Sequence, residues 1–252
     1  MIFKEFGNIK NPTIILLHGG GLSWWMWKLQ IEVLSKDYFV VTPILDGHGE
    51  DFETNFESIE ISAQKLINYI KNSDKGRVYA IGGLSIGAQI VVEILSREPE
   101  ITNFAIIESA LVYPIKTITA FTVPMFNLFY GLIKYKWYAR LQAKTLNVPA
   151  ELFDLYFKDS SRMSKKTLIN FTISNGNYTM PQNLINSKAK TLIMVGGKEL
   201  SVMKKSAKLL SCTLKNNSLK LIPNFSHGEI SIIDSIKYID SVKQHFENYK
   251  NE

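Results

Sequence analysis

Short apolar runs alternate with longer amphipathic segments along most of this 252-residue chain. The runs are rich in β-branched and aromatic residues and end in glycine, proline or polar turns, which predicts strands. They cover residues 13–18, 38–43, 77–82, 103–108, 190–196 and 218–223. Apolar positions at helical spacing mark residues 56–72, 86–98 and 232–249. This alternation predicts an α/β fold, a mostly parallel, doubly wound sheet covered by helices on both faces.

The interval between Glu108 and Lys190 is the exception to this alternation. Its helix-like residues 111–187 hold 13 of the 29 aromatic residues of the chain. They also hold nine Lys and Arg against three Asp and Glu, so the whole formal excess of +6 lies there. We therefore expect a core domain of residues 1–110 and 188–252, with residues 111–187 inserted as a helical cap.

Composition and charge exclude several classes of protein. Cys212 is the only cysteine, so no intramolecular disulfide or cysteine-based metal cluster can form, and a reducing cytoplasm is expected. No charged-then-apolar leader follows Met1, which argues against export. The longest apolar stretch, residues 118–133, is shorter than a spanning helix and is interrupted by proline and glycine, so no transmembrane segment is expected.

The basic character of the chain also bears on its partners. A sequence pI near 9.1 would permit binding to nucleic acid. However, the basic residues of the 111–187 interval are mixed with core-type aromatic residues and match no nucleic-acid-binding motif. We therefore expect a small-molecule partner and no nucleic acid, and the sequence predicts no oligomeric state.

Ser85 stands in the sequence Gly-Leu-Ser-Ile-Gly at residues 83–87, between a predicted strand and a predicted helix. This arrangement is typical of a nucleophile elbow, a tight turn in which bulkier residues would collide with strand and helix. Because ligands bind at the carboxyl ends of strands in an open parallel sheet, the turn would present the serine hydroxyl to a cleft. The first N–H groups of the helix, notably that of Ile86, could stabilise a negative oxygen there.

A serine hydroxyl needs a base to remove its proton, and the chain has four histidines. We expect His245 on a solvated face of the last predicted helix. His18 and His48 lie in glycine-rich turns, where they would brace loops. His227 follows the last predicted strand, at the same edge of the sheet as Ser85, and is therefore the predicted base.

The base in turn needs a carboxylate that fixes its tautomer and stabilises the imidazolium. Two glutamates come at the ends of predicted strands: Glu199 after the interval and Glu108 before it. Glu199 is favoured because serine, then acid, then histidine is the usual chain order of this architecture, with the acid after the penultimate strand. Glu108 stays open as the alternative acid.

Together these motifs resemble the α/β-hydrolases of the small, capped esterase and lipase type, over essentially the full length of the chain. In that family a strand-end His-Gly turn, here residues 18–21, supplies an N–H of the oxyanion hole. The role carries over to Gly20 and less directly to Gly21, while Ile86 supplies the second N–H. The chain departs from the family pattern at Ile44, where an aspartate is common, and at Glu199, where aspartate is the more frequent acid.

The resemblance implies a two-step acyl transfer at an ester carbonyl. Ser85 would attack, His227 would take and return the proton, and the N–H groups of Gly20 and Ile86 would hold the oxyanion before water releases the acid. No metal or organic cofactor is implied. The apolar interval favours carboxylic esters of small to medium apolar compounds. The alternatives are other reactions of the same triad (thioester hydrolysis, carbon–carbon hydrolysis, cofactor-free peroxide chemistry) or a non-catalytic, ligand-binding homologue.

Overall fold

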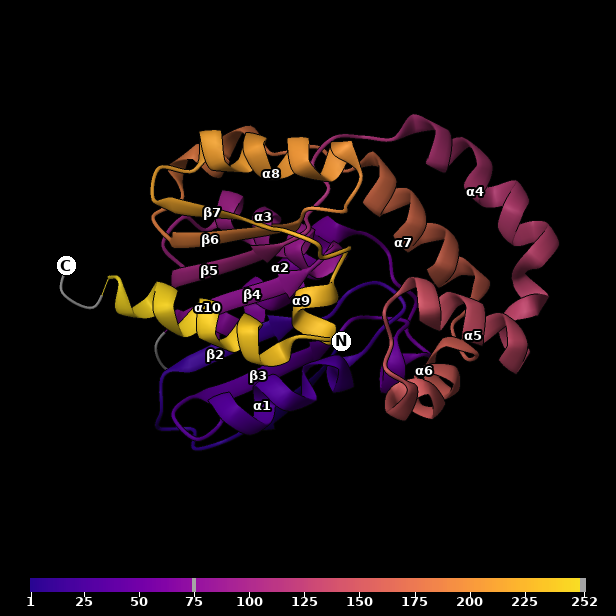
Figure 1. Cartoon of the computed structure of the whole chain (residues 1–252), viewed down its shortest axis with the longest axis horizontal. Coiled ribbons are helices and arrows are strands. Elements are labelled where there is room, and N and C mark those ends of the chain that lie inside the picture. Colours follow the sequence, from indigo (N-terminus) through magenta and orange to yellow (C-terminus); the bar gives the residue numbers. More distant parts are fainter. Residues whose placement is uncertain (74–75, 250–252) are drawn as a thin grey trace.

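The computed structural model describes residues 1–73 and 76–249, and their strands form one seven-stranded sheet (Figure 1). The strands are β1 (Ile2–Phe6), β2 (Thr13–Leu17), β3 (Phe39–Ile44), β4 (Val78–Leu84), β5 (Thr102–Glu108), β6 (Lys190–Gly196) and β7 (Asn217–Ile222). Their order in the sheet is β1-β3-β2-β4-β5-β6-β7. β1 runs antiparallel to β3 and the other neighbouring pairs are parallel, which confirms the predicted α/β class.

Helices follow most of these strands. The described α-helices are α1 (Lys28–Leu34), α2 (Ile59–Lys71), α3 (Ile86–Arg97), α4 (Lys116–Phe129), α5 (Lys136–Thr145), α6 (Phe153–Ser160), α7 (Lys165–Asn177), α8 (Ser201–Thr213), α9 (Glu229–Ile232) and α10 (Ser235–Glu247). A short 3-10 helix, η3 (Tyr130–Lys134), joins α4 to α5. Among the described residues, no helix has both the length and the apolar character needed to cross a membrane.

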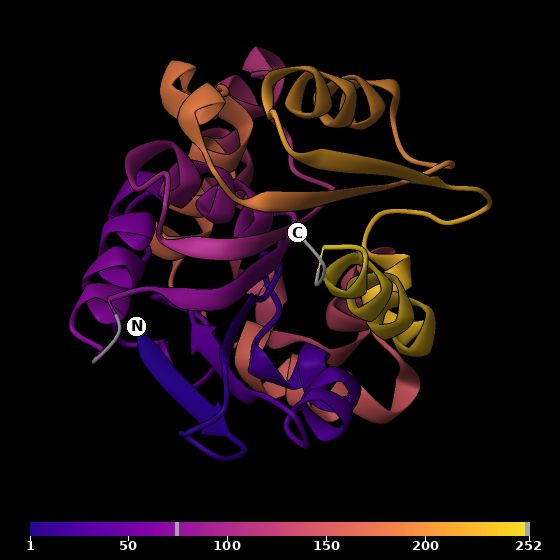
Figure 2. The same ribbon diagram turned by 90° about the vertical axis from the view of Figure 1, so that its left-hand side faces the viewer.

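The sequence of strand β2 is continuously apolar because both faces of this strand are buried. Successive side chains of a strand point to opposite faces. Ile14 and Leu16 join a buried cluster with residues of α1 and α10, whereas Ile15 and Leu17 join a cluster with residues of α2, α3 and α8. Both faces of the sheet are therefore covered, and Figure 2 shows the sheet between α2 on the left and α10 on the right.

The six predicted strands correspond to β2 through β7, and their ends differ from the prediction by at most two residues. Strands β5 and β6 are neighbours in the sheet although the long interval separates them in sequence, and Glu108 is in register with Met194. The interval contains α4 to α7, which we call the α4–α7 segment (residues 116–177). Figure 1 shows this segment beyond the carboxyl ends of the strands.

Candidate active site

The turn between β4 and α3 holds Ser85 in a strained backbone conformation, with φ +56° and ψ −117°. A Cβ atom on Gly83 would lie 2.4 Å from the carbonyl carbon of Gly87, and a Cβ on Gly87 would lie 2.6 Å from the carbonyl oxygen of Leu17. No side chain fits at either position, which explains both glycines of the elbow. The N–H of Ser85 donates to the carbonyl of Glu108 at 2.9 Å and ties the turn to β5.

Ser85 lines a cavity of about 430 Å³ at the carboxyl edge of the sheet. The core contributes Ser85 together with Gly20, Gly21 and Ile86, which carry or adjoin the N–H groups proposed for the oxyanion hole. Most of the remaining wall comes from the α4–α7 segment and is largely apolar, with Phe126, Ile133, Leu141, Leu146, Tyr156, Met163, Leu168 and Phe171. The serine thus faces a space whose walls favour apolar groups over charged ones.

The two backbone N–H groups proposed for the oxyanion hole lie next to the same cavity. Gly20, Gly21 and Ile86 all line it together with Ser85. A Cβ on Gly20 would lie 3.7 Å from Cγ2 of Ile86, so the β2 turn and the start of α3 are adjacent. Ile86 is the first residue of α3, and the first N–H groups of a helix have no partner within it.

His18 and His48 are fully buried beside this turn and stay uncharged. Burial lowers the pKa of His18 to about 3 and that of His48 to about 4. Nε2 of His18 accepts the N–H of Leu45 at 3.1 Å, so its Nδ1 carries the proton and donates to the carbonyl of Gly19 at 2.8 Å. His18 therefore braces the β2 turn and has no ring nitrogen left for proton transfer.

His227 follows β7, and its Nδ1 lies 2.8 Å from Oε2 of Glu199. The carboxylate of Glu199 also accepts the hydroxyl of Ser109 and the N–H of Gly196, each at 2.7 Å. Burial by itself raises the pKa of the Glu199 carboxyl, but its three donors outweigh burial and hold the pKa below its usual value. An ionised Glu199 makes Nδ1 of His227 the protonated nitrogen and leaves Nε2 to accept a proton.

The loop that carries His227 packs against the serine turn. A Cβ on Gly228 would lie 3.0 Å from Cδ2 of Leu84, the residue that precedes Ser85. The described residues show no hydrogen bond between the Ser85 hydroxyl and the ring of His227. Hydrogen bonds between catalytic groups are often long in unliganded enzymes and shorten when substrate binds.

Asn147, in the loop after α5, also contacts the loop that carries His227, which we call the histidine loop. Its Nδ2 donates to the hydroxyl of Ser226 at 3.1 Å and to the carbonyl of His227 at 3.0 Å. Its backbone φ of +55° is one that asparagine tolerates better than most residues. Sequence reasoning missed Asn147, since nothing local marks it, and Ser109, whose partner Glu199 is 90 residues away.

Within the same loop, the N–H and the hydroxyl of Ser226 both donate to Oε2 of Glu229, at 2.6 and 2.8 Å. This pattern resembles a capping box, which a Ser-x-x-Glu sequence before a helix predicts. That signal was present in the sequence at residues 226–229 but did not enter the prediction.

Glu108, the alternative acid, is in a different environment. It is 1% exposed, and neither carboxylate oxygen has a hydrogen-bond partner of ordinary geometry in the described structure. Burial raises its pKa to about 8, nearby Ser231 partly offsets this effect, and the charge of Glu199 adds to it. His227 is hydrogen-bonded to Glu199 and not to Glu108.

The prediction for His245 was wrong. The residue is 2% exposed, its ring packs against Phe104 and Tyr249, and its Nε2 lies 3.1 Å from the carbonyl oxygen of Lys190. The helical spacing did contain the signal, because Tyr238 and Val242 are buried on the same face of α10, seven and three residues earlier.

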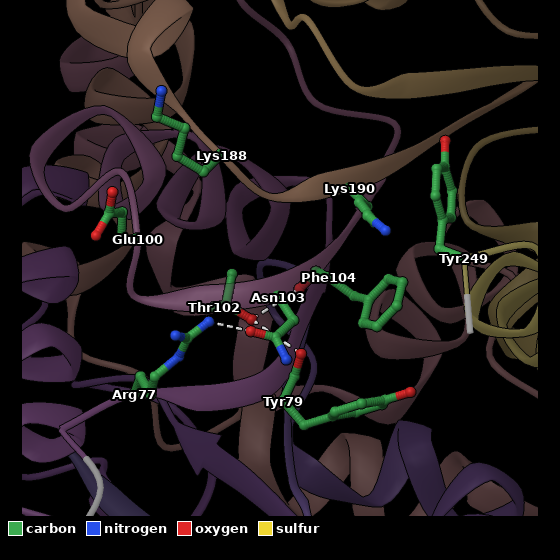
Figure 3. Close-up of a pocket in the computed structure, with 9 residues that line it drawn as sticks. All are labelled: Arg77, Tyr79, Glu100, Thr102, Asn103, Phe104, Lys188, Lys190 and Tyr249. Atoms are coloured by element: carbon green, nitrogen blue, oxygen red, sulfur yellow. Dashed lines mark hydrogen bonds between the residues drawn. The ribbon is translucent and has the colours of Figure 1, made fainter. Parts of the chain in front are cut away.

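A second cavity of about 450 Å³ lies at the amino ends of β4, β5 and β6, the edge opposite Ser85 (Figure 3). It is lined by Arg77, Tyr79, Glu100, Thr102, Asn103, Phe104, Lys188, Lys190 and Tyr249. Arg77 donates to the side chain of Asn103 and the Thr102 hydroxyl donates to the carbonyl of Tyr79, as the dashed lines mark. None of the predicted site residues lies there.

Over residues 1–73 and 76–249, no cluster of three or more His, Cys, Asp or Glu side chains has an arrangement that could hold a metal ion. The predicted site residues at the carboxyl edge of the sheet supply a hydroxyl, an imidazole, a carboxylate and backbone N–H groups.

Comparison with known proteins agrees with this architecture. The crystal structure reported with the carboxylesterases of Nitrososphaera gargenis has a TM-score of 0.81 at 17% identity, covering 98% of this chain and 93% of that one. The enol-lactonase from Burkholderia xenovorans has a TM-score of 0.80 at 14% identity, covering 98% and 96%. At these identities the likeness concerns the fold alone.

Relatives in sequence give the same classification. An AB hydrolase superfamily protein of Gibberella zeae is 28% identical over 144 residues, which are 55% of this chain and 49% of that protein. The chain spans between a third and a half of the length of the curated relatives it matches. Residues 14–171, more than half of the chain, match the alpha/beta hydrolase family. The chain therefore belongs to the alpha/beta hydrolase family.

Proposed function

We propose that this protein is a serine hydrolase that cleaves carboxylic esters of small to medium apolar compounds through an acyl-enzyme intermediate. The observation that carries the proposal is the hydrogen bond between Glu199 and His227, whose own loop packs on the turn of Ser85. A serine nucleophile, a histidine base and an ionised acid are the groups that nucleophilic acyl transfer requires.

In the proposed reaction, Oγ of Ser85 attacks the ester carbonyl carbon while Nε2 of His227 takes the hydroxyl proton. The N–H groups of Gly20 and Ile86 donate to the oxyanion of the tetrahedral intermediate. His227 then returns the proton to the departing alcohol, which leaves Ser85 acylated. A water molecule, deprotonated by His227, attacks the acyl group and releases the carboxylic acid and the free serine.

The assignment of the acid to Glu199 rests on electrostatics as well as on contact. Glu199 has three hydrogen-bond donors that favour its charged form. Glu108 is buried without such donors and stays protonated over most of the neutral range. A protonated carboxyl would not stabilise an imidazolium, so we propose Glu108 as a structural group beside the site.

We further propose that residues 111–187 act as a cap that supplies the acyl pocket. Its apolar wall over Ser85 supports an uncharged acyl or alkyl group in preference to a sugar or a peptide. Thioesters fit the same chemistry and remain the second candidate substrate class. A cytoplasmic location is part of the proposal, because the single cysteine, Cys212, suits a reducing compartment.

The nucleophile and the acid are tested by three substitutions assayed on p-nitrophenyl butyrate. Ser85→Ala should lower kcat by about 10³-fold or more, because the covalent step is lost. Glu199→Gln should lower kcat by about 10²- to 10⁴-fold, since the amide no longer fixes the tautomer of His227. Glu108→Gln should lower it less than about tenfold. Wild-type turnover by Ser85→Ala would contradict the proposal, and a larger loss in Glu108→Gln than in Glu199→Gln would reassign the acid.

The substrate class is tested with p-nitrophenyl esters from acetate to palmitate. Each added methylene that enters an apolar pocket contributes about 0.8 kcal/mol, so kcat/KM should rise up to about fourfold per carbon and then fall once the pocket is full. The matching thioesters distinguish the second candidate. A flat profile, or activity on the acetate alone, would show that residues 111–187 form no acyl pocket.

The raised pKa of Glu108 also predicts that the stability of the fold depends on pH. Its pKa is about 8 in the folded protein against 4.5 for the free group, so between these pH values only the unfolded state has lost the proton. The free energy of unfolding should therefore fall as pH rises from 4.5 to about 8 and level off above that. Glu108→Gln should lack this component, so that wild type loses a few kcal/mol relative to the variant across the window. Urea unfolding of both proteins over this range measures it; a constant difference would mean that Glu108 ionises normally.

Asn147 is predicted to be a positioning residue for His227. Asn147→Gly keeps a backbone that accepts positive φ but removes both hydrogen bonds, and should lower kcat about tenfold with little change in KM. The matched control is Asn224→Gly, which has a φ of +67° in the β7–α9 loop and no side-chain hydrogen bond in the described structure. Equal losses in the two variants, or a loss explained by a lower Tm, would show that Asn147 only stabilises the fold.

A further inference from the structure

Helix α4 exposes a stripe of large apolar side chains. Phe121, Met125, Leu128 and Phe129 recur at positions i, i+4, i+7 and i+8, which lie on one face of a helix. Their exposed fractions are 71%, 45%, 74% and 48%. We call these four residues the apolar stripe. Large apolar groups concentrated in this way on a surface usually mark a site of interaction.

Helix α5 continues this apolar surface toward the cavity. Trp137 and Leu141 are 55% and 59% exposed and stand four residues apart, on one face of the helix. Leu141 also lines the cavity that contains Ser85. The exposed apolar residues of α5 therefore reach from solvent to the mouth of the candidate active site. Figure 1 shows α4 and α5 at the outer end of the molecule.

The charge along the stretch that contains α4 and α5 has a single sign, although exposed Glu151 and Asp154 lie near the start of α6, which packs against α5. Residues 109–150 contain five Lys and Arg and no Asp or Glu. Four bases lie between the end of α4 and the end of α5, and all four are exposed: Lys134, Lys136, Arg140 and Lys144. Lys144 is three residues after Leu141 and shares its face of α5. Exposed apolar and aromatic side chains flanked by an excess of bases are typical of segments that lie in a lipid interface.

We propose that the surface formed by the apolar stripe, Trp137, Leu141 and the four exposed bases docks on an anionic lipid surface. The apolar side chains would enter the boundary between headgroups and acyl chains, with the bases at the level of the anionic headgroups. Docking would be peripheral and would place the cavity mouth beside the lipid. It goes beyond the proposed ester hydrolysis and does not depend on Ser85.

Other occupants fit this surface less well. A second copy of the chain would bring two surfaces with an excess of positive charge together, which like-charge repulsion disfavours. A folded acidic protein would need hydrogen bonds at roughly one per 100–200 Å² of interface, and the apolar stripe offers no side-chain donor or acceptor. A fluid hydrocarbon phase requires neither shape complementarity nor hydrogen bonds from this face.

The test is co-sedimentation of the full chain with vesicles of phosphatidylcholine, with and without phosphatidylglycerol, at low and high salt. Wild type and Ser85→Ala should bind equally to the anionic vesicles and weakly to the neutral ones, and added salt should weaken binding. Because Ser85→Ala has no proposed catalytic function, its binding separates docking from hydrolysis. Of the four tryptophans, Trp137 is the most exposed, and its fluorescence should shift to shorter wavelength on binding.

Matched variants locate the surface. The double variant Phe121→Ser with Leu128→Ser should bind about tenfold more weakly or worse, whereas Ile236→Ser with Leu29→Ser, exposed by 72% and 53% elsewhere on the protein, should bind as wild type. Lys134→Gln with Lys144→Gln should lose about fivefold per charge. The equivalent pair on α8, Lys205→Gln with Lys208→Gln, should lose much less.

Several results of the vesicle assay would overturn the proposal. They are no binding of wild type to anionic vesicles, equal binding to neutral vesicles, equal losses in the control variants, and no effect of the apolar-stripe variant. Sedimentation velocity covers the remaining alternative: a wild-type dimer that the apolar-stripe variant converts to monomer, without vesicle binding, would identify the surface as a contact between copies. A Trp137 shift that survives in the apolar-stripe variant would also count against docking through α4.

Discussion

Ser85 has a backbone φ of +56°, a conformation that a residue with a side chain keeps only when its surroundings enforce it. Here Gly87 presses against the carbonyl of Leu17, and the N–H of Ser85 is bonded to the carbonyl of Glu108. The turn is therefore held by β2, β5 and α3 as well as by its own strand. Because those elements form the centre of the sheet, the backbone of Ser85 is anchored directly to the core.

Glu108 and Glu199, at the ends of neighbouring strands, have pKa values that their surroundings shift in opposite directions. Both are buried, and the charge of Glu199 helps to raise the pKa of Glu108. Glu199 receives three hydrogen bonds and keeps its charge, whereas Glu108 lacks comparable donors and keeps its proton. Two adjacent buried charges would repel strongly, so a neutral Glu108 allows Glu199 to be ionised next to it.

The α4–α7 segment has an inner side and an outer side with different properties. Its inner residues form most of the apolar wall over Ser85, and Asn147, in the loop between α5 and α6, reaches the histidine loop. Its outer residues on α4 and α5 are apolar and basic. A movement of this segment would change the pocket and the support of His227 together, which links the proposed lipid contact to the proposed chemistry.

Much of this architecture could be predicted from the sequence by itself. The strands, the elbow around Ser85 and the position of His227 after the last strand follow from local patterns, because apolar periodicity and steric limits at glycine act over a few residues. Only the tertiary structure decided that Glu199 rather than Glu108 reaches His227, that Asn147 supports the loop that carries His227, and that Glu108 lacks donors comparable to those of Glu199. Those contacts join segments far apart in the chain, and their distances depend on the order of strands in the sheet, which differs from their order in the sequence.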